Sequence, residues 1–177
     1  MARNCHKSVY HAALLQELSI DYLYPDVTEF GIAESILPEM VSQKLSEAKT
    51  LEAPYQAIVI TSPTYDGITS DIAAIADIAH AYHIPLIVDE AHGAHFGFSD
   101  VFPKKAHTLG ADIVIESIHK TLPALTQSAA LHIADSPFIN EARIKQYLSI
   151  FQTSSPSYVL MAGLDQCTQL LQNHSSE

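Results

Sequence analysis

The chain has 177 residues, 47% of them hydrophobic, and its 9 Lys and Arg against 20 Asp and Glu give a net charge of −11. This length fits one domain with enough apolar residues to form a core, and the long apolar runs exclude a disordered chain. The acidic balance argues against nucleic acid as a partner, because a negative surface repels phosphates. No apolar run approaches the roughly 20 residues that cross a bilayer, so we expect no membrane partner.

The two cysteines, Cys5 and Cys167, lie far apart in the sequence and form no CxxC pair. A disulfide scaffold or a cysteine-rich zinc module is therefore not expected. The first eight residues contain no apolar core of a signal peptide. We expect a cytoplasmic protein.

The hydrophobic pattern alternates between helical and strand-like segments along the chain. The expected elements in chain order are helix 7–18, strand 20–24, helix 34–48, strand 56–61, helix 72–82, strand 86–88, short helix 104–109, strand 113–115, strand 128–134, helix 138–151 and helix 158–171. Ser70 and Asp71 are expected to cap the helix over 72–82, and Gly110 to close the one over 104–109. Strands that are apolar on both faces and alternate with helices predict an α/β fold, with a mostly parallel sheet flanked by helices.

Polar side chains follow three of the expected strands, at the point where each strand ends. These groups are Thr61, Ser62 and Thr64; Asp89, Glu90 and His92; and Ser117, His119 and Lys120. In open α/β sheets, ligands bind beyond the carboxyl ends of the strands. A right-handed crossover between two of these strands places Asp89 and Lys120 at the same edge of the sheet. The sequence therefore predicts an acid and a lysine in one crevice.

This set of side chains suits a particular cofactor. A lysine on a loop past a strand end is a candidate nucleophile for a carbonyl group, and a carboxylate suits a cationic ring nitrogen. Hydroxyl and imidazole donors suit a phosphate, and pyridoxal phosphate combines an aldehyde, a pyridine nitrogen and a phosphate. The alternative is a surface ion pair between Asp89 and Lys120, worth less than about 1 kcal/mol.

Four runs of residues then match a known family in order. They are RNCHKS at 3–8, TSPTYDG at 61–67, DEAHGAH at 89–95 and SIHKTLPALTQ at 117–127. The chain resembles the bacterial Orn/Lys/Arg decarboxylases over about residues 3–158. Their large domain has the aspartate-aminotransferase fold, the type I fold of pyridoxal-phosphate enzymes. The resemblance implies decarboxylation of arginine, lysine or ornithine to the corresponding amine and CO2.

The resemblance also implies roles around the cofactor ring. Lys120 would attach covalently to the cofactor, and Asp89 would hold the pyridine nitrogen. His6 would stack on one face of the ring, and Ala91 would pack against the other. Lys120 or His92 would supply the proton that completes the reaction, and the sequence does not choose between them.

Four further residues receive roles in the same way. Ser117 and His119 would bind the phosphate, and Ser62 would lie near the ring hydroxyl. Thr153 would reach the phosphate of a neighbouring subunit, because the resemblance implies a homodimer or a larger homo-oligomer with the site at the interface.

The matched segment is expected to be a partial large domain. The family's large domain begins before Arg3 with a loop that completes the phosphate site, and a small domain follows it. We therefore expect residues 1–177 to be a truncated decarboxylase. The family strand between segments 20–24 and 57–61 is also expected to be missing, which would leave unpaired backbone edges.

The sequence leaves three alternatives to the decarboxylase. The chain could be a catalytically inactive remnant that serves as a binding or dimerisation module. Asp89, His92 and His95 could bind a metal in a hydrolase, although we expect no metal, and His107 and His132 have no motif context. The letters DEAH at 89–92 also occur in helicases, but no phosphate-binding loop precedes them, which argues against ATP hydrolysis.

Overall fold

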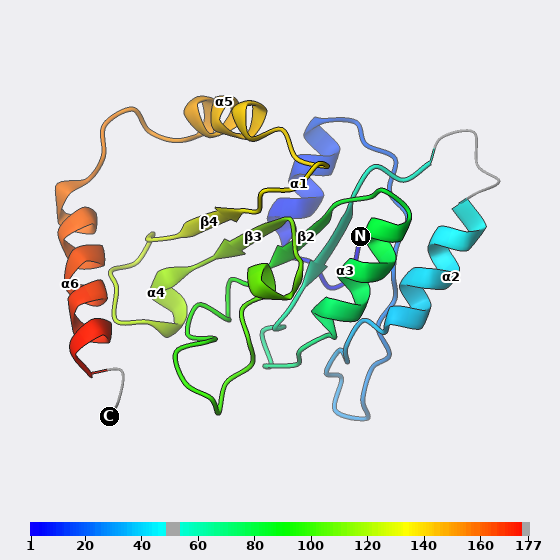
Figure 1. Ribbon diagram of the computed structural model, residues 1–177, viewed down its shortest axis with the longest axis horizontal. Helices are drawn as coiled ribbons and strands as arrows, with labels where there is room; N and C mark the ends of the chain where they lie inside the picture. The colour runs from blue at the N-terminus through cyan, green and yellow to red at the C-terminus, as the bar shows by residue number, and fades with distance from the viewer. Residues whose placement is uncertain (49–53, 175–177) are drawn as a thin grey trace.

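The computed structural model describes residues 1–48 and 54–174, and its centre is a four-stranded sheet. The strands are β1 (Ile58–Thr61), β2 (Leu86–Asp89), β3 (Ile113–Glu116) and β4 (Ala130–Ile133), and they follow this order across the sheet (Figure 1). β1, β2 and β3 are parallel, and β4 is antiparallel to β3. The predicted α/β fold with a mostly parallel sheet is confirmed.

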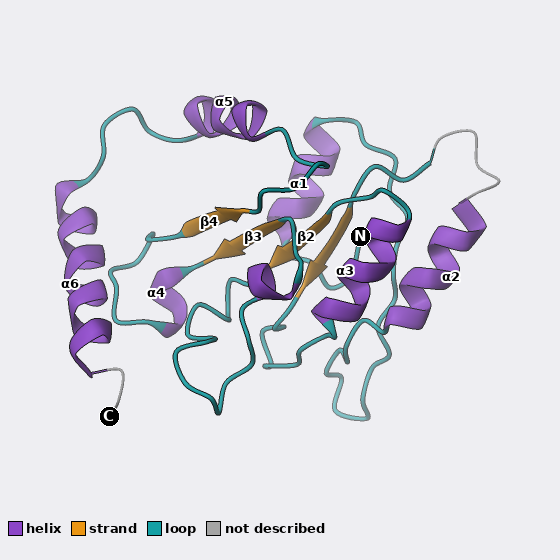
Figure 2. Ribbon diagram, in the orientation of Figure 1, coloured by secondary structure: helices purple, strands orange, loops and turns teal. Residues whose placement is uncertain are grey.

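Six α-helices and one 3-10 helix complete the described part of the chain (Figure 2). They are α1 (Lys7–Leu15), α2 (Pro38–Ala48), α3 (Ile72–Ala81), η1 (Ala106–Leu109), α4 (Ile118–Thr121), α5 (Glu141–Phe151) and α6 (Tyr158–His174). None of these helices is both long and apolar enough to cross a bilayer.

The core lies between the sheet and α3. Ile75 and Ala79 of α3 belong to one buried cluster with Leu86, Val88 and Val114 of the central strands. α3 begins where the Asp71 side chain accepts a hydrogen bond from the Ala74 N–H at 3.1 Å, which confirms Asp71 as its cap. α2 lies beside α3 in Figures 1 and 2. Because successive side chains of a strand point to opposite faces, alternate residues of each strand face this core and the others face the opposite side of the sheet.

The first residues of the chain extend the sheet beyond β1. The Ala2 N–H donates to the Val59 carbonyl at 2.8 Å, and the Arg3 N–H donates to the Leu23 carbonyl at 2.8 Å. The expected strand over 20–24 is reduced to a single parallel bridge between Leu23 and Ala2. The expectation of unpaired edges is corrected, because residues 1–3 bond to both neighbouring segments.

Several expected boundaries were wrong at helix ends. α1 stops at Leu15 because Glu17 adopts a positive φ of 51°, which the helix cannot continue. α2 begins at Pro38, whose fixed φ suits a first helical position, and the Ile36 N–H just before it is bonded to the Ser70 hydroxyl. α5 starts at Glu141, where Asn140 caps it.

The expected helix over 104–109 is only the 3-10 turn η1. Gly110 closes it with a φ of 100°, as the sequence predicted. α6 extends three residues further than expected, to His174. β1 begins at Ile58 rather than at residue 56.

Candidate active site

The polar residues that follow β1, β2 and β3 lie together at one edge of the sheet. The register pairs Thr61 with Asp89 and Asp89 with Ile115, so the three strands end side by side. Backbone bonds continue this alignment past the strands, from the Ser62 N–H to the Asp89 carbonyl at 3.1 Å and from the Glu90 N–H to the Ile115 carbonyl at 2.9 Å. The polar residues that follow these strands therefore share one edge of the sheet, as the sequence predicted.

Lys120 lies in the short helix α4 rather than on a loop, which corrects the expectation. Ser117 precedes this helix, and its carbonyl accepts the Lys120 N–H at 3.1 Å, so the turn begins directly at the end of β3. The Lys120 ammonium lies 3.0 Å from Nε2 of His92. Among the ion pairs of the described residues none includes Lys120, so the alternative pair between Asp89 and Lys120 is not formed.

The pKa of His92 responds to three of the residues predicted around the ring. Burial and then the positive charge of Lys120 hold its pKa below the ordinary histidine value, while Asp89 acts in the opposite direction and His6 lowers the pKa slightly further. A neutral imidazole has a free lone pair on one nitrogen, so Nε2 of His92 can accept a hydrogen bond from Lys120. His6, Asp89 and Lys120 thus all lie near enough to His92 to affect its pKa.

A tight turn after β2 presents Asp89. Its Oδ1 accepts the N–H of the buried Ala91 at 3.2 Å, and the carboxylate is half-buried. A Cβ on Gly93 would lie 2.7 Å from Glu90 Cγ and 2.8 Å from Pro63 Cδ. Only glycine therefore allows this turn to approach the loop after β1 so closely.

His6 lies at the start of α1, and Ser62 directly follows β1. His6 is exposed at the start of α1, where its Nδ1 accepts the Ser8 N–H at 3.3 Å. Ser62 is 3% exposed, and its hydroxyl oxygen accepts the Ser70 N–H at 3.0 Å. Ser62 therefore already joins the loop after β1 to the segment before α3.

His119 is oriented by the backbone. Its Nδ1 lies 2.7 Å from the Ser128 carbonyl oxygen, which only accepts, so Nδ1 carries a proton. Its Nε2 can then donate to an anion only when the ring is doubly protonated. The neighbouring Ser117 makes no hydrogen bond to cap α4 with its side chain.

Thr153 is not brought to this group of residues. It lies in an exposed turn between α5 and α6, where its hydroxyl contacts the backbone of Ser155. Figure 1 shows this turn well away from α4, which carries Lys120. Within one chain, Thr153 does not line the crevice.

The donor set fits pyridoxal phosphate. Lys120 offers an amine that no carboxylate holds, Asp89 offers a half-buried carboxylate with one backbone bond, and His6 offers an exposed ring. These are the partners that an aldehyde, a pyridine nitrogen and an aromatic ring face require. Ser117 and His119 add a hydroxyl and an imidazole for a phosphate.

A second polar cluster, on the core-facing side of the sheet, was missed from the sequence. Glu90 and Glu116 are both buried, and burial together with Glu116 raises the pKa of Glu90 to about 8. The Lys105 ammonium lies 3.0 Å from Oε1 and 3.2 Å from Oε2 of Glu116. The alternation of side chains along a strand could have predicted it. Glu90 lies two residues after Val88 and Glu116 two residues after Val114, so both continue the core-facing side of their strands.

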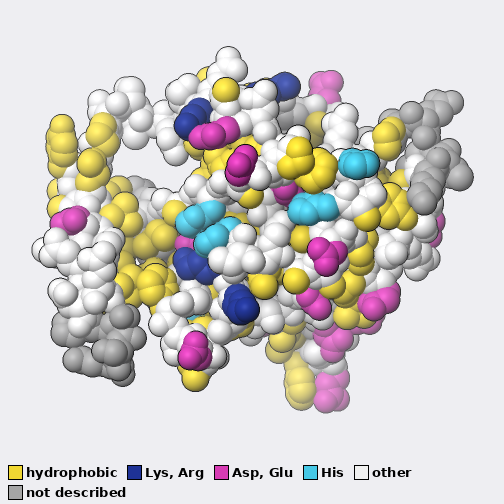
Figure 3. All heavy atoms as spheres, viewed as in Figure 1, with side chains coloured by type: hydrophobic (Ala, Val, Ile, Leu, Met, Phe, Trp, Pro, Cys, Tyr) yellow, Lys and Arg dark blue, Asp and Glu magenta, His cyan; other side chains and the backbone are white. Residues whose placement is uncertain are grey.

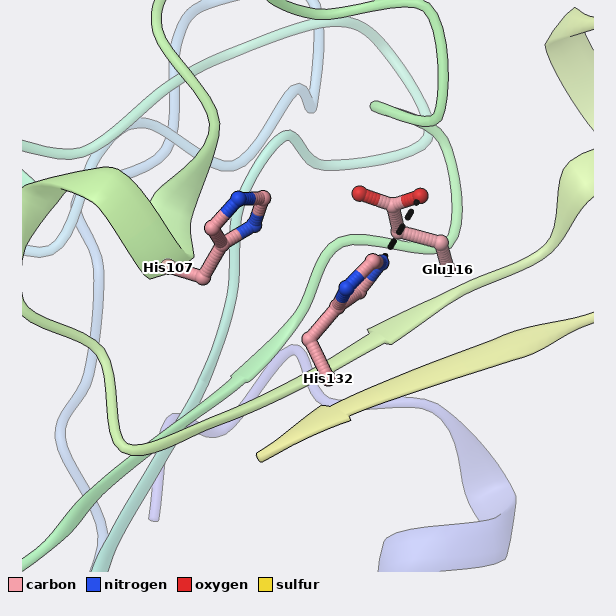
Figure 4. A group of neighbouring side chains, drawn as sticks. All are labelled: His107, Glu116 and His132. Carbon is pink, nitrogen blue, oxygen red and sulfur yellow. Dashed lines mark ion pairs between the residues drawn. The ribbon is translucent and has the colours of Figure 1, made fainter. Parts of the chain in front are cut away.

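His107 and His132 belong to this second cluster (Figure 4). Their rings stack with centroids 4.8 Å apart, and Nε2 of His132 lies 3.3 Å from Oε2 of Glu116. In the described part of the chain, the grouping suited to a metal is this one and not Asp89, His92 and His95. The structure therefore does not support the alternative of a metal hydrolase with Asp89, His92 and His95 as ligands.

The chain is similar in sequence to a family of decarboxylases. The family model described as the major domain of Orn/Lys/Arg decarboxylase matches residues 1–177. The uncharacterised protein YaaO of Bacillus subtilis is 45% identical over 163 residues, which are 92% of this chain and 33% of YaaO. An arginine decarboxylase of Bacillus subtilis is 35% identical over 164 residues, which are 92% of this chain and 32% of that enzyme. The chain thus spans about a third of the length of the curated relatives it matches.

Solved structures share the fold. A high-resolution structure of SPT with PLP superimposes with a TM-score of 0.64 at 18% identity, and the match covers 98% of this chain and 41% of SPT. At this identity the likeness concerns the fold alone, and it agrees with the α/β architecture expected from the sequence.

Proposed function

Because the chain belongs to the Orn/Lys/Arg decarboxylase family, we propose that it provides the central part of a pyridoxal-phosphate site that decarboxylates a basic amino acid. The observation that carries this proposal is the position of Lys120, whose ammonium faces the neutral His92 beside Asp89. Residues 1–177 would then form the central part of the large domain, with activity belonging to the whole protein.

Lys120 is the residue that attaches to the cofactor. An ammonium group is not nucleophilic, so Nζ must lose a proton before it attacks a carbonyl. Nε2 of His92, 3.0 Å away, is placed to accept that proton. Lys120 or His92 would also supply the proton that completes the reaction.

The remaining residues hold the cofactor and shape its surroundings. When bound, pyridoxal phosphate supplies an electron sink for the electron pair left by departing CO2. Asp89 would hold the pyridine nitrogen, while His6 and Ala91 would cover the two faces of the ring and exclude water. Ser62 would lie near the ring hydroxyl.

The phosphate receives donors from both sides of a dimer in this proposal. Ser117 and His119 would hold its oxygens from one copy, and hydrogen bonds to an anion are the stronger kind. Thr153 donates from a second copy, which fits its exposed position away from Lys120. The substrate class is arginine, lysine or ornithine, as the family description implies.

Cofactor attachment tests the proposal directly. The purified chain is titrated with pyridoxal phosphate, the visible absorption of the lysine-bound cofactor is recorded, and borohydride reduction followed by peptide mass mapping locates the modified lysine. We expect modification at Lys120 and loss of the band in Lys120→Ala. Lys104→Ala, which removes an exposed lysine outside the site, is the matched control and should keep the band.

Two outcomes would count against the proposal. A wild-type chain without the absorption band would support the alternative of an inactive binding or dimerisation module. Modification spread over surface lysines, unchanged in Lys120→Ala, would show that the crevice has no special affinity. If the band forms, amine production from arginine, lysine and ornithine then identifies the substrate.

A further inference from the structure

The cluster of His107, Glu116 and His132 lies on the core-facing side of the sheet, and the proposed decarboxylation does not use it. His107 belongs to η1, Glu116 is the last residue of β3, and His132 lies in β4 (Figure 4). Each residue offers one ligand atom, and these atoms all lie within 4.8 Å of one another. Three separate elements therefore bring two imidazoles and one carboxylate to one place.

Two ring nitrogens in this cluster have no hydrogen-bond partner. They are Nδ1 of His107 and Nε2 of His132, and both atoms are buried. Nε2 of His132 lies within ion-pair distance of Glu116, at 3.3 Å, but without the geometry of a hydrogen bond. Buried polar atoms are bonded in the great majority of cases, so two orphaned nitrogens beside one carboxylate require an explanation.

We propose that His107, Glu116 and His132 bind a divalent transition-metal ion, with Zn²⁺ as the best match. Two imidazole nitrogens and one carboxylate oxygen are a common zinc ligand set, and they leave a fourth position for water. Bonds of about 2.1 Å in a tetrahedral site require ligand atoms within roughly 3.4 Å of one another. Metal binding therefore requires the half-buried side chains of His107 and His132 to move closer to Glu116.

Lys105 is the competitor for this site. Its ammonium contacts both oxygens of Glu116, so it balances the carboxylate when no metal is bound. This ammonium opposes metal binding, because two cations held close to the same carboxylate repel each other. Lys105 therefore weakens metal binding, and its removal is expected to strengthen it.

Glu90 holds one ligand in position. Its Oε1 accepts the N–H of Ala106 at 3.0 Å, and Ala106 directly precedes His107. The carboxyl of Glu90 thus fixes the start of η1 against the end of β2. Groups that orient the ligands in this way are typical of metal sites.

A metal at this position would fix the segment that carries Lys120. Residues 117–129 leave the sheet directly after Glu116 and return to it in β4, where His132 pairs with Val114. Metal bonds to Glu116 and His132 would therefore join the two ends of this segment. Figure 3 shows histidine side chains near the middle of one face, over β3 and β4. A lysine or arginine side chain lies next to them.

Zinc titration of the metal-free chain, without pyridoxal phosphate, tests the proposal. Calorimetry is expected to give one Zn²⁺ per chain, and zinc is expected to raise Tm. His107→Ala and His132→Ala should each weaken binding by at least about 100-fold, because loss of a ligand exceeds the 10- to 100-fold effect of an outer residue. His11→Ala, which removes an exposed histidine on α1, should leave binding unchanged.

A gain of affinity provides the second test, since a poorly folded variant cannot produce it. Lys105→Met is expected to bind Zn²⁺ about 10-fold more tightly, because the competing ammonium is gone while the apolar stem remains. Co²⁺ should give the visible absorption of a four-coordinate site in the wild type and lose it in His132→Ala. No binding by the wild type, unchanged affinity in His132→Ala, or weaker binding in Lys105→Met would each overturn the proposal.

Discussion

At the residue scale, the pairing of Lys120 with His92 determines what the candidate active site can do. A lysine that faces a carboxylate is held in its charged form, whereas one that faces a neutral imidazole can transfer a proton. The structure shows the second arrangement, since Nζ of Lys120 lies 3.0 Å from Nε2 of His92. Asp89 thus remains available for another cation.

The lowered pKa of His92 predicts a pH dependence of stability. The unfolded chain takes up a proton near pH 6.5, while the folded chain resists protonation of His92. The contribution of neutral His92 to stability is therefore complete above that pH and is lost as the pH falls below it. We expect Tm of His92→Gln to fall less than that of the wild type between about pH 7 and pH 5.

Thermal unfolding at a series of pH values measures this difference. His11→Gln changes an exposed histidine outside the site and should reproduce the wild-type slope. A His92→Gln curve parallel to the wild-type curve would show that folding does not alter the protonation of His92.

Sequence reasoning located some site residues and missed others for a physical reason. Asp89 and Lys120 follow neighbouring parallel strands, and the carboxyl ends of such strands always share an edge. The grouping of His107 with His132 depends on the position of η1 and on the antiparallel return of β4. Neither feature is encoded in local hydrophobic periodicity, so these histidines could not be paired from the sequence.

At the element scale, strands with continuous β-branched runs were predicted well, and short or edge segments were not. β1, β2 and β3 lie within a residue or two of their expected positions because each is apolar on both faces. α4 was missed, since four residues provide no helical period. The segment over 20–24 pairs at one residue only, because its position depends on the distant residues 1–3.

α6 is docked on the rest of the chain through a small contact. The segment with Pro123, Ala124 and Leu125 lines a pocket together with Val159 and Gly163 of α6. Among the described residues, the main core cluster includes none from α6, although Cys167 is 3% exposed. We therefore expect α6 to detach without unfolding of the sheet.

Gly163→Val tests this independence. A Cβ at Gly163 would already lie 3.1 Å from Cγ and Cδ1 of Leu125, so a branched side chain must push α6 outwards. Overpacking costs about 1–3 kcal/mol, partly offset by the poor helix propensity of glycine. We expect amide hydrogen exchange in α6 to accelerate by about 10-fold, with exchange in β1–β3 unchanged.

Gly163→Ala is the matched variant, because its smaller contact is balanced by better helix propensity. It should exchange like the wild type. Equal acceleration in α6 and in the central strands of Gly163→Val would mean that the helix and the sheet unfold as one unit.

At the scale of the whole molecule, apolar residues gather around the turn that carries Thr153. Phe151, Tyr158 and Val159 are 75%, 80% and 69% exposed, and they flank this turn on both sides. Figure 3 shows hydrophobic side chains at the corresponding corner, where α6 begins. Exposed apolar patches of this kind mark interaction surfaces, which supports contact with a second copy under the proposed function.

Mixing two variants tests whether Thr153 acts across the interface between copies. Lys120→Ala cannot attach the cofactor, and Thr153→Ala should bind it more weakly through loss of one phosphate donor. In a mixed dimer, one site has both substitutions, and the other has wild-type Lys120 from one chain and wild-type Thr153 from its partner. We therefore expect mixing to restore tight cofactor attachment in part of the population, measured by the absorption band at limiting pyridoxal phosphate. If Thr153 acts within its own chain, every remaining lysine-bearing site keeps the substitution, and mixing restores nothing.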